Sequence, residues 1–314
     1  MSTVSKQRGR PSVTEVADTS TATRYEGVIT AAFGRHYEVL LPDGSHITGF
    51  PRGKKSPFAC GDRVALEVAS ADQAQITKHL PRTSLLYRSD DYREKLIAAN
   101  ATQVVLVVAT EPSFTDDLLT RTLVAAEVEG LRTLIVLNKA DLSEHLLHAR
   151  ERLAMLAKLG YRIIELSAKE DASALLPYLA GEVSVLVGQS GMGKSTLTNS
   201  LIPEARAATR EISEALDSGK HTTTYARLYE LPQDKASGGK LIDCPGLQEF
   251  GLSHLTFGQI EEGFIDFRPH SGNCRFRDCR HQNEPDCAIK AAVDAGQIDP
   301  KRYDMFHRIA SAKC

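Results

Sequence analysis

The first patterned segment of the chain alternates apolar and polar residues and is broken by turns. Alternating segments occupy residues 25–31, 37–41, 46–50 and 63–68, and Pro42-Asp43-Gly44 is a turn signal between two of them. Alternation with turns at intervals of about 8–12 residues is typical of a small antiparallel barrel. We therefore expect a five-stranded barrel of the OB type over residues 24–82.

Continuous apolar segments replace this alternation after Gln103. Segments of this kind are typical of parallel strands that are buried on both faces. The expected strands are Val104–Ala109, Thr133–Leu137, Ile163–Leu166, Val183–Val187 and Lys240–Asp243, and the expected helices between them include Leu118–Glu129 and Glu144–Leu159. Strands that alternate with helices indicate an α/β fold with a doubly wound sheet, which we expect over residues 83–255.

The two ends of the chain have different patterns. Residues 1–23 are rich in Ser and Thr and have almost no large apolar side chains, so we expect a disordered tail. Whether this tail only adds solubility or becomes ordered on RNA stays open. After Leu255 the strand signals stop, and two helical segments near 256–267 and 288–311 flank a group of Cys and His residues. We expect a helical C-terminal domain over residues 256–314.

Composition narrows the class of protein. The chain has 314 residues, of which 42% are hydrophobic and 25% charged, as in an ordinary globular protein. No apolar segment approaches the roughly 18–20 residues of a membrane helix, and the first 23 residues lack the apolar core of a secretory signal. We therefore expect a cytoplasmic protein that does not enter a membrane.

Charge is distributed unevenly along the chain. The overall net charge is −2, but residues 1–100 carry +3, residues 101–267 carry −8 and residues 268–314 carry +3. An anionic partner such as RNA would therefore meet the two ends, although ordinary solvated surfaces produce the same asymmetry. In the barrel, the loop 51–55 is basic. Phe33, His36 and Tyr37 either offer stacking faces to bases or fill the barrel.

A glycine-rich segment between an expected strand and an expected helix matches the phosphate-loop pattern GxxxxGK[ST]. Its residues are Gly188, Gln189, Ser190, Gly191, Met192, Gly193, Lys194 and Ser195. Glycines allow backbone N–H groups to turn toward phosphates, and the helix N-terminus adds its dipole. We expect Lys194 to contact the β- and γ-phosphates and the Ser195 hydroxyl to bind Mg²⁺.

Two further motifs follow expected strands and indicate a guanine nucleotide. The first is Asn138-Lys139-Ala140-Asp141, in which Asp141 can accept hydrogen bonds from guanine N1–H and the exocyclic amine. The second is Ser167-Ala168-Lys169, in a loop able to close on the base. Ligands bind at the strand ends of a doubly wound sheet. Together with the phosphate loop, these motifs predict GTP and GDP as ligands.

The segment Asp243-Cys244-Pro245-Gly246 resembles the DxxG element of GTPases. In that element the Asp holds Mg²⁺ through water and the Gly N–H senses the γ-phosphate. Between the phosphate loop and this element, Thr222-Thr223-Thr224 supplies hydroxyls for a Mg²⁺-binding threonine. We favour Thr223, with little to separate it from Thr222.

The order of these motifs is unusual. In an ordinary GTPase the phosphate loop, the Mg²⁺-binding threonine and DxxG precede NKxD and SAK, whereas here NKxD and SAK come first. The same site is therefore expected in a circularly permuted domain, a rearrangement that is tolerated when the original termini lie close together. In this order DxxG leads directly into the C-terminal domain, so movement at Gly246 is expected to act on that domain.

A cluster of metal-ligand residues lies near the C-terminus. Cys274, Cys279, His281 and Cys287 place three thiols and one imidazole within 14 residues. Four such ligands with no open position suit a tetrahedral structural Zn²⁺. Two disulfides are the alternative, but they would require a cysteine from outside the cluster. Arg275, Arg277 and Arg280 add positive charge between the ligands.

With these motifs in place, the chain resembles the ribosome small-subunit-dependent GTPase A family, the RsgA-type circularly permuted GTPases. The resemblance covers residues 25–314. It implies GTP hydrolysis stimulated by the 30S subunit, contact with 16S rRNA and a role in late 30S maturation, and we expect a monomer. The alternative is a nucleotide-gated RNA-binding module that acts on other RNA, with incidental hydrolysis. A P-loop ATPase or kinase is disfavoured by the NKxD motif.

The residue that positions the attacking water is less evident. Many GTPases have a Gln directly after DxxG, but this chain has Leu247, whose side chain cannot hydrogen-bond to water. We therefore expect slow intrinsic hydrolysis and a group from elsewhere. Gln248 and His254 are the polar residues just beyond, and His254 is preferred because an imidazole accepts a proton near neutral pH. A surface role for His254 is the alternative.

Overall fold

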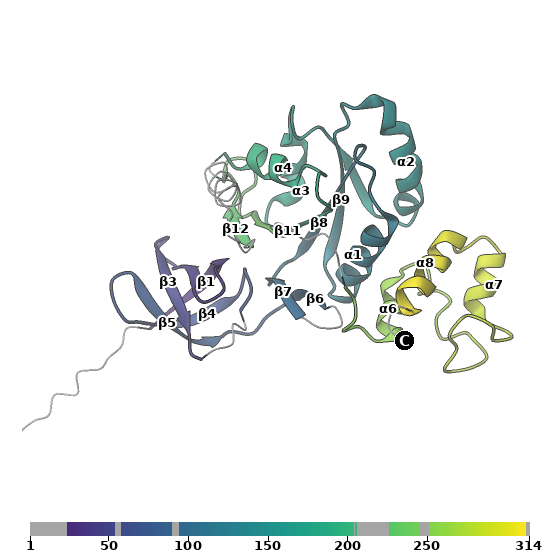
Figure 1. The fold of residues 1–314 in the computed structure, drawn as a ribbon, viewed down its shortest axis with the longest axis horizontal. Helices are drawn as coiled ribbons and strands as arrows, with labels where there is room; N and C mark the ends of the chain where they lie inside the picture. The colour runs from purple at the N-terminus through teal and green to yellow at the C-terminus, as the bar shows by residue number, and fades with distance from the viewer. Residues whose placement is uncertain are drawn as a thin grey trace, which may run out of the picture.

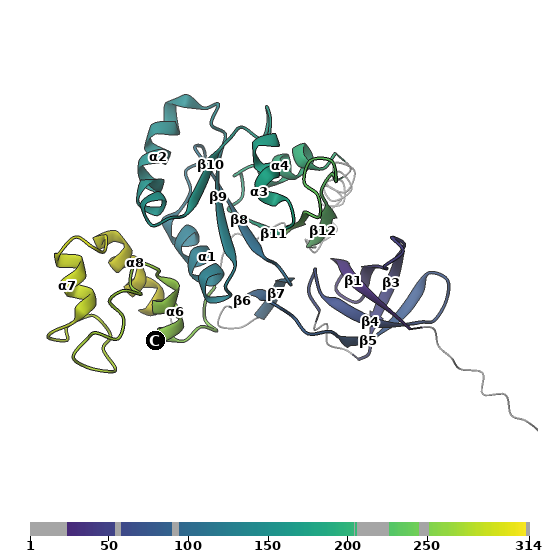
Figure 2. The ribbon, with the colours of Figure 1, turned by 180° about the vertical axis from the view of Figure 1, so that it is seen from behind.

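The computed structural model describes residues 24–53, 58–89, 94–203, 205, 226–244 and 251–311. Three regions follow one another along the chain: a β-barrel, a central sheet with helices, and a group of C-terminal helices. The barrel and the C-terminal helices lie at opposite ends of the molecule with the central sheet between them (Figures 1 and 2).

The N-terminal barrel is closed and has five strands, as the sequence predicts. Its strands are β1 (Arg24–Ala32), β2 (Tyr37–Leu40), β3 (His46–Pro51), β4 (Arg63–Val68) and β5 (Gln73–His79). They pair in the order β1-β2-β3-β5-β4, and β4 returns to pair with β1. Alternate side chains such as Ile29, Val39 and Leu66 fill the interior. Tyr37 lies among them and is fully buried, so this aromatic residue fills the barrel.

A two-stranded hairpin that the sequence reasoning did not anticipate follows the barrel. It consists of β6 (Leu85–Ser89) and β7 (Glu94–Ala99). The hairpin joins the barrel at Cys60, which forms a bridge with Ala98 and accepts a hydrogen bond from the Ala99 N–H at 2.9 Å. It lies between the barrel and the central sheet (Figure 1).

The central sheet has five parallel strands in the order β10-β9-β8-β11-β13. These strands are β8 (Gln103–Ala109), β9 (Arg132–Asn138), β10 (Arg162–Glu165), β11 (Val183–Val187) and β13 (Lys240–Asp243). Helices α1 (Asp116–Val128) and α2 (Ser143–Lys158) lie on one side, and α3 (Leu176–Leu179) and α4 (Lys194–Leu201) on the other (Figures 1 and 2). Every residue of β8 is buried, which explains its continuous apolar sequence. The predicted doubly wound sheet is confirmed.

An additional strand, β12 (Arg227–Glu230), joins the central sheet to the barrel. It pairs antiparallel with β13 and also with β1, where Arg227 lies opposite Ala31. The Arg227 guanidinium donates to Glu38 of the barrel at 2.8 Å. Barrel and central sheet are therefore connected through one continuous run of paired strands.

The C-terminal region contains α6 (Phe257–Gly263), α7 (Ala288–Asp294) and α8 (Pro300–Ser311). The helical segment predicted near 288–311 is therefore two helices, because Gly296 adopts a φ of +70° after α7 and Pro300 begins α8. The rings of Phe264, Phe267 and Phe306 pack with centroids 5.0–5.4 Å apart.

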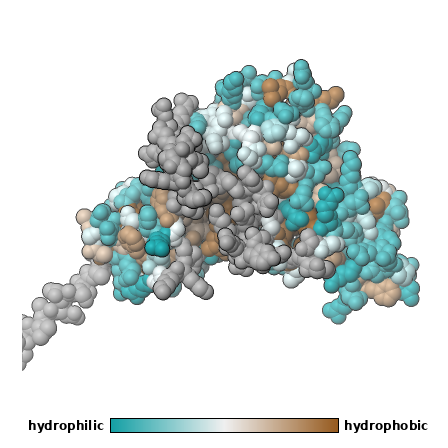
Figure 3. All heavy atoms as spheres, viewed as in Figure 1, coloured by the Kyte–Doolittle hydropathy of each residue, from teal (hydrophilic) through white to brown (hydrophobic). Residues whose placement is uncertain are grey.

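The exterior carries mostly polar side chains on the face seen in Figure 3, where hydrophobic residues occur in small patches, including some on the barrel and around α2. Among the described helices, none combines the length and the apolar character needed to cross a membrane.

Candidate functional site

Four predicted motifs lie at the same edge of the central sheet. Strand β9 ends at Asn138, β10 ends shortly before Ser167, β11 ends before Gly188, and β13 ends at Asp243. Because these strands are parallel, their carboxyl ends meet at one edge. The chain therefore brings NKxD, SAK, the phosphate loop and the start of DxxG together despite their permuted order.

Asn138 connects three of these motifs. Its Nδ2 donates to the Met192 carbonyl at 2.8 Å, and its Oδ1 accepts from the Ala168 N–H at 2.9 Å. The residue is 2% exposed, so both hydrogen bonds are shielded from water. The Asn138 side chain therefore links the phosphate loop to the SAK loop.

The phosphate loop has the backbone that its glycines predict. Gly193 has a φ of +89°, and a Cβ at this position would lie 2.3 Å from Nδ2 of Asn138. Only glycine fits here. Helix α4 begins directly afterwards at Lys194, so its N-terminus faces the loop. The Lys194 ammonium lies within the loop and donates to the carbonyls of Gly188 and Gln189 at 2.5 and 2.7 Å.

A half-buried lysine and a buried aspartate lie at the base of this loop. Burial lowers the pKa of Lys194, while the Asp243 carboxylate opposes that shift. Burial likewise raises the pKa of Asp243, against the Lys194 charge and a 3.3 Å hydrogen bond from Thr198. A phosphate beside Lys194 and a cation near Asp243 would each favour the charged form. The residues therefore fit a nucleotide phosphate with Mg²⁺.

The residues predicted to contact the base surround the SAK loop. Asp141 and Lys169 are exposed, while Ser167 and Ala168 are buried. The Ser167 hydroxyl has no hydrogen-bond partner among the described residues. Lys139 adopts a φ of +60°, and its ammonium donates to the Glu111 carbonyl at 2.6 Å. This arrangement leaves the exposed Asp141 available to a ligand, whereas the Ser167 hydroxyl is buried without a partner in the described part of the chain.

Gln189 of the phosphate loop has a partner that the sequence reasoning missed. The Thr115 N–H donates to its Oε1 at 2.9 Å, and its Nε2 donates to the Thr115 hydroxyl at 3.0 Å. Thr115 is the N-cap of α1 and is followed by Asp116 and Asp117, a recognisable helix-start signal. That signal locates the helix but does not indicate its contact with the phosphate loop.

Several predicted residues lie outside the described part of the chain. They are Thr222, Thr223, Gly246, Leu247 and Gln248. The predicted Mg²⁺ ligand Thr223 and the γ-phosphate contact at Gly246 therefore stay predictions.

His254, the predicted water-positioning residue, is described. Its ring packs against the ring of Tyr87, with centroids 4.0 Å apart and planes inclined by 36°. Tyr87 belongs to β6, so the hairpin between barrel and sheet contacts the segment that follows DxxG. No pattern near Tyr87 or His254 in the sequence indicates this contact.

The Cys/His cluster is assembled as predicted. The sulfurs of Cys274, Cys279 and Cys287 and one nitrogen of His281 all lie within 4.8 Å of one another. The Sγ atoms of Cys274 and Cys287 are 3.8 Å apart, and they lie 3.6 and 3.4 Å from Nδ1 of His281. A tetrahedral site with Zn–S bonds of about 2.3 Å separates two sulfurs by about 3.8 Å. The donor set therefore fits zinc.

The described cysteines are all free thiols, which disfavours the disulfide alternative. Two of the three arginines of the cluster, Arg275 and Arg280, have partners on the chain. Arg275 donates to Asp286 at 3.0 Å, and the Arg280 guanidinium lies 4.5 Å from the centre of the Phe257 ring. Beside them, the Phe276 ring is 41% exposed.

The chain is similar to proteins from several bacteria. It is 51% identical to the small ribosomal subunit biogenesis GTPase RsgA of Ralstonia pickettii over 96% of each chain. It is 54% identical to the protein of the same name from Burkholderia pseudomallei over 91% of each chain.

Solved structures agree with the fold. YjeQ from Thermotoga maritima has a TM-score of 0.70 at 28% identity and covers 93% of this chain and 99% of its own. YloQ, described as a circularly permuted GTPase, has a TM-score of 0.67 at 26% identity over 93% of this chain and 95% of its own. The family model for the RsgA GTPase matches residues 79–253, and with the relatives above it shows that the chain belongs to the RsgA GTPase family.

Proposed function

We propose that this chain hydrolyses GTP to GDP and phosphate and acts in the maturation of the small ribosomal subunit. The observation that carries the proposal is the joining of NKxD, SAK and the phosphate loop through the Asn138 side chain at one edge of the sheet. Relatives that share about half of their residues with this chain, over nearly their full length, are named for small-subunit biogenesis, which supports the biological role.

The described residues divide the binding of GTP between base and phosphates. Asp141 accepts hydrogen bonds from the guanine edge, with Ser167-Ala168-Lys169 beside the base. The N–H groups of residues 188–195 and the start of α4 surround the phosphates, and Lys194 exchanges its two carbonyl partners for phosphate oxygens. Mg²⁺, when bound, neutralises charge on the phosphates; Ser195 and Thr223 would hold it, with Asp243 acting through water.

His254 is the proposed positioning group for the attacking water. Its neutral imidazole can accept a hydrogen bond from water or a proton near neutral pH. In this structure the ring lies against Tyr87, so the proposal requires the segment after DxxG to move when GTP and the subunit are bound.

The proposed partner is the 30S subunit with its 16S rRNA, and we propose that the chain binds it as a monomer. In this chain the barrel spans residues 24–82, the permuted GTPase domain residues 83–255 and the C-terminal domain residues 256–314. A structural Zn²⁺ held by Cys274, Cys279, His281 and Cys287 would order the last of these. RNA would meet the basic barrel loop of Arg52, Lys54 and Lys55, of which the two lysines lie outside the described residues.

Turnover of GTP tests this function most directly. We expect slow hydrolysis by the chain alone, strong stimulation by 30S subunits, and little by 50S subunits or 70S ribosomes. His254→Ala is expected to bind GTP and 30S normally but to lose most of the stimulated turnover. Full stimulation of that variant would remove His254 from the mechanism. Equal stimulation by free RNA would favour the nucleotide-gated RNA-binding module.

The RNA-facing loop has its own test. Replacing Arg52, Lys54 and Lys55 by Ala together is expected to weaken 30S binding and reduce its salt dependence, because each phosphate contact releases counterions. GTP affinity should not change. Equal 30S binding would place the RNA contact elsewhere, with Arg275, Arg277 and Arg280 as the next candidates.

A further inference from the structure

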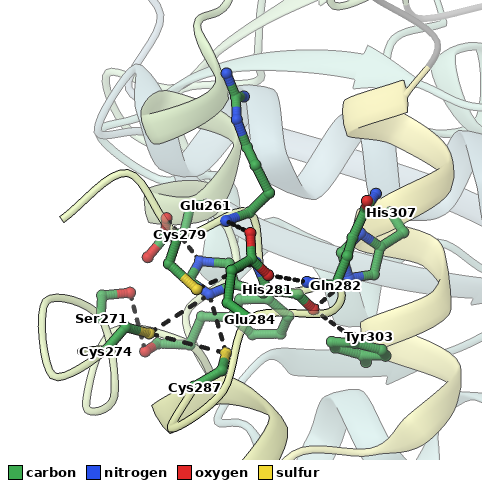
Figure 4. Close-up of polar contacts among 12 residues, drawn as sticks. Glu261, Ser271, Cys274, Cys279, His281, Gln282, Glu284, Cys287, Tyr303 and His307 are labelled. Atoms are coloured by element: carbon green, nitrogen blue, oxygen red, sulfur yellow. Dashed lines mark hydrogen bonds and ion pairs between the residues drawn. The ribbon is translucent and has the colours of Figure 1, made fainter. Parts of the chain in front are cut away.

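One contact of the Cys/His cluster comes from outside its own loop. Nε2 of His281 lies 3.2 Å from Oε2 of Glu261, which belongs to α6 (Figure 4). The side chain of His281 is 3% exposed and that of Glu261 is 17% exposed. Water therefore screens this carboxylate and imidazole less than it screens an ion pair on the surface.

The two nitrogens of the His281 ring face different groups. Nδ1 faces the sulfurs of Cys274 and Cys287, whereas Nε2 faces Glu261. Among the described residues, the buried Nε2 forms no hydrogen bond of regular geometry, and Glu261 is the charged group at ion-pair distance from it. An imidazole that binds a metal through one nitrogen carries its proton on the other, and that N–H needs an acceptor. Glu261 is the acceptor that this geometry offers.

His281 is also held through its main chain. The backbone of His281 has a φ of +61°, and its carbonyl is contacted by the hydroxyl of Tyr303 and by Nε2 of His307 at 3.2 Å, both on α8. Thus α8 holds the main chain of His281, and α6 faces its ring (Figure 4).

We propose that Glu261 is a positioning residue for the metal ligand His281. It accepts the Nε2–H, directs Nδ1 toward the thiols and ties the metal-binding loop to α6. The proposal rests on the zinc site proposed above for these four ligands.

Through α6, the contact between Glu261 and His281 is connected to the central domain. The helix begins at Phe257, just after His254, and packs closely on α1, because a Cβ on Gly263 would lie 2.7 Å from Cγ1 of Val124. An ion bound at the cluster therefore stabilises, through Glu261, a helix that belongs to the packing of the central domain.

The test compares two neighbouring glutamates of α6 in the full chain. Glu261→Gln removes the carboxylate, and Glu262→Gln makes the same change at an exposed position. Competition with a chromogenic chelator would measure the affinity of each variant for Zn²⁺. Because a neutral amide oxygen accepts a weaker hydrogen bond than a carboxylate does, zinc binding is expected to weaken by roughly 10–100-fold in Glu261→Gln, with no change in Glu262→Gln. Equal affinities in both variants and the unmodified chain would overturn the proposal.

A second measurement does not depend on whether Glu261→Gln folds. Long-range ¹H–¹⁵N correlation spectra of the unmodified, zinc-loaded chain report which ring nitrogen of His281 binds the metal. Zinc on Nδ1, with a slowly exchanging proton on Nε2, supports the proposal. Zinc on Nε2, or rapid exchange of that proton, overturns it. If the unmodified chain binds no zinc at all, the zinc site itself fails; if it binds zinc and only the Glu261 results fail, the site stands and the positioning role falls.

Discussion

The nucleotide site and the Cys/His cluster differ in what places their ligand groups. At the nucleotide site, strand ends and hydrogen bonds such as those of Asn138 fix the backbone before any ligand binds. In the cluster, the ligand atoms belong to side chains of a loop between α6 and α7, and they lie within 4.8 Å of one another. The fold of the central domain positions the groups of the nucleotide site, whereas metal binding at the cluster is expected to order part of the C-terminal region.

The hydrophobic packing around the two sites also differs. The nucleotide site lies on a sheet whose β8 strand is entirely buried. The buried residues of the C-terminal region continue the hydrophobic core of the central domain. Among them are Phe264, Phe267 and Phe306, beside a buried pair in which Arg302 donates to Asp266 at 2.6 and 3.1 Å. The His281 ring reaches this core, with its centroid 6.0 Å from that of the Phe306 ring. The other three ligand side chains are thiols, so we expect the conformation of the Cys/His loop to depend most on a bound metal.

Removal of zinc is expected to have the largest effect and to separate the two sites. Freshly purified protein should contain one zinc per chain, because structural zinc contributes about 10–16 kcal/mol of apparent binding free energy in small folds. Chelation should increase hydrogen exchange at residues 274–287 and loosen the C-terminal region, while GTP affinity is retained.

Cys279→Ser should reproduce the effect of chelation. Cys60→Ser is the control, because Cys60 is a buried thiol of the barrel that donates to the Thr30 carbonyl at 3.3 Å, a bond that serine can keep. Elemental analysis that finds no metal in the fresh protein would end the zinc assignment.

Asp141→Asn should affect only the nucleotide site. Hydrogen bonds to a charged acceptor contribute about 1.5–3 kcal/mol each, so losing two should lower GTP affinity by a factor of about 100 or more. The new amide donor would face the guanine amine, so preference should shift toward xanthine nucleotides. Competition binding with GTP, XTP and ATP measures this shift. Unchanged GTP affinity together with equal competition by ATP would contradict the motif assignment, and zinc content should stay constant throughout.

The sequence reveals the nucleotide site well because its signals are local. A strand followed by Gly188–Ser195 or by Asn138–Asp141 carries its own context, and parallel strands bring such loops to one edge. The zinc ligands are equally visible because they lie within one short segment. In both cases residue type and spacing contain most of the information.

Contacts between distant segments were missed for the opposite reason. Nothing near Tyr87 indicates that its ring meets His254, and nothing near Glu261 indicates His281. Strand β12 was not predicted because its four residues, Arg227–Glu230, are too few to show a repeating pattern of apolar and polar positions. Its pairing with β1 also depends on how the barrel and the central sheet pack together. Such contacts follow from tertiary packing, which a local pattern does not contain.

Asn138→Ala tests whether the nucleotide site is preformed by the protein. The change leaves the Met192 carbonyl and the Ala168 N–H without their partner in a buried place, at a cost of about 1–3 kcal/mol of unfolding free energy. GTP affinity should fall as well, because the phosphate loop and the SAK loop lose their link. Urea unfolding and GTP binding measure the two effects.

Thr133→Val is the matched control on the same strand. The Thr133 hydroxyl has no hydrogen-bond partner among the described residues, so its removal should be nearly neutral. If Asn138→Ala were as mild as Thr133→Val, the Asn138 bridge would not be what preforms the site.

The smallest expected effect concerns α6, the element between the two sites. The Thr256 hydroxyl accepts from the Gln259 N–H at 3.2 Å, and the Thr256 N–H donates to Gln259 Oε1 at 2.9 Å, which forms a capping box. Thr256→Ala should cost about 1 kcal/mol of unfolding free energy, and Thr256→Ser should restore most of it. Measured with and without zinc, this cost also decides whether the sites are independent. If α6 is held by its cap at one end and by Glu261 and the metal-binding loop at the other, the cost should differ between the two states by about 0.5 kcal/mol or more. An equal cost in both states would mean that α6 does not couple them.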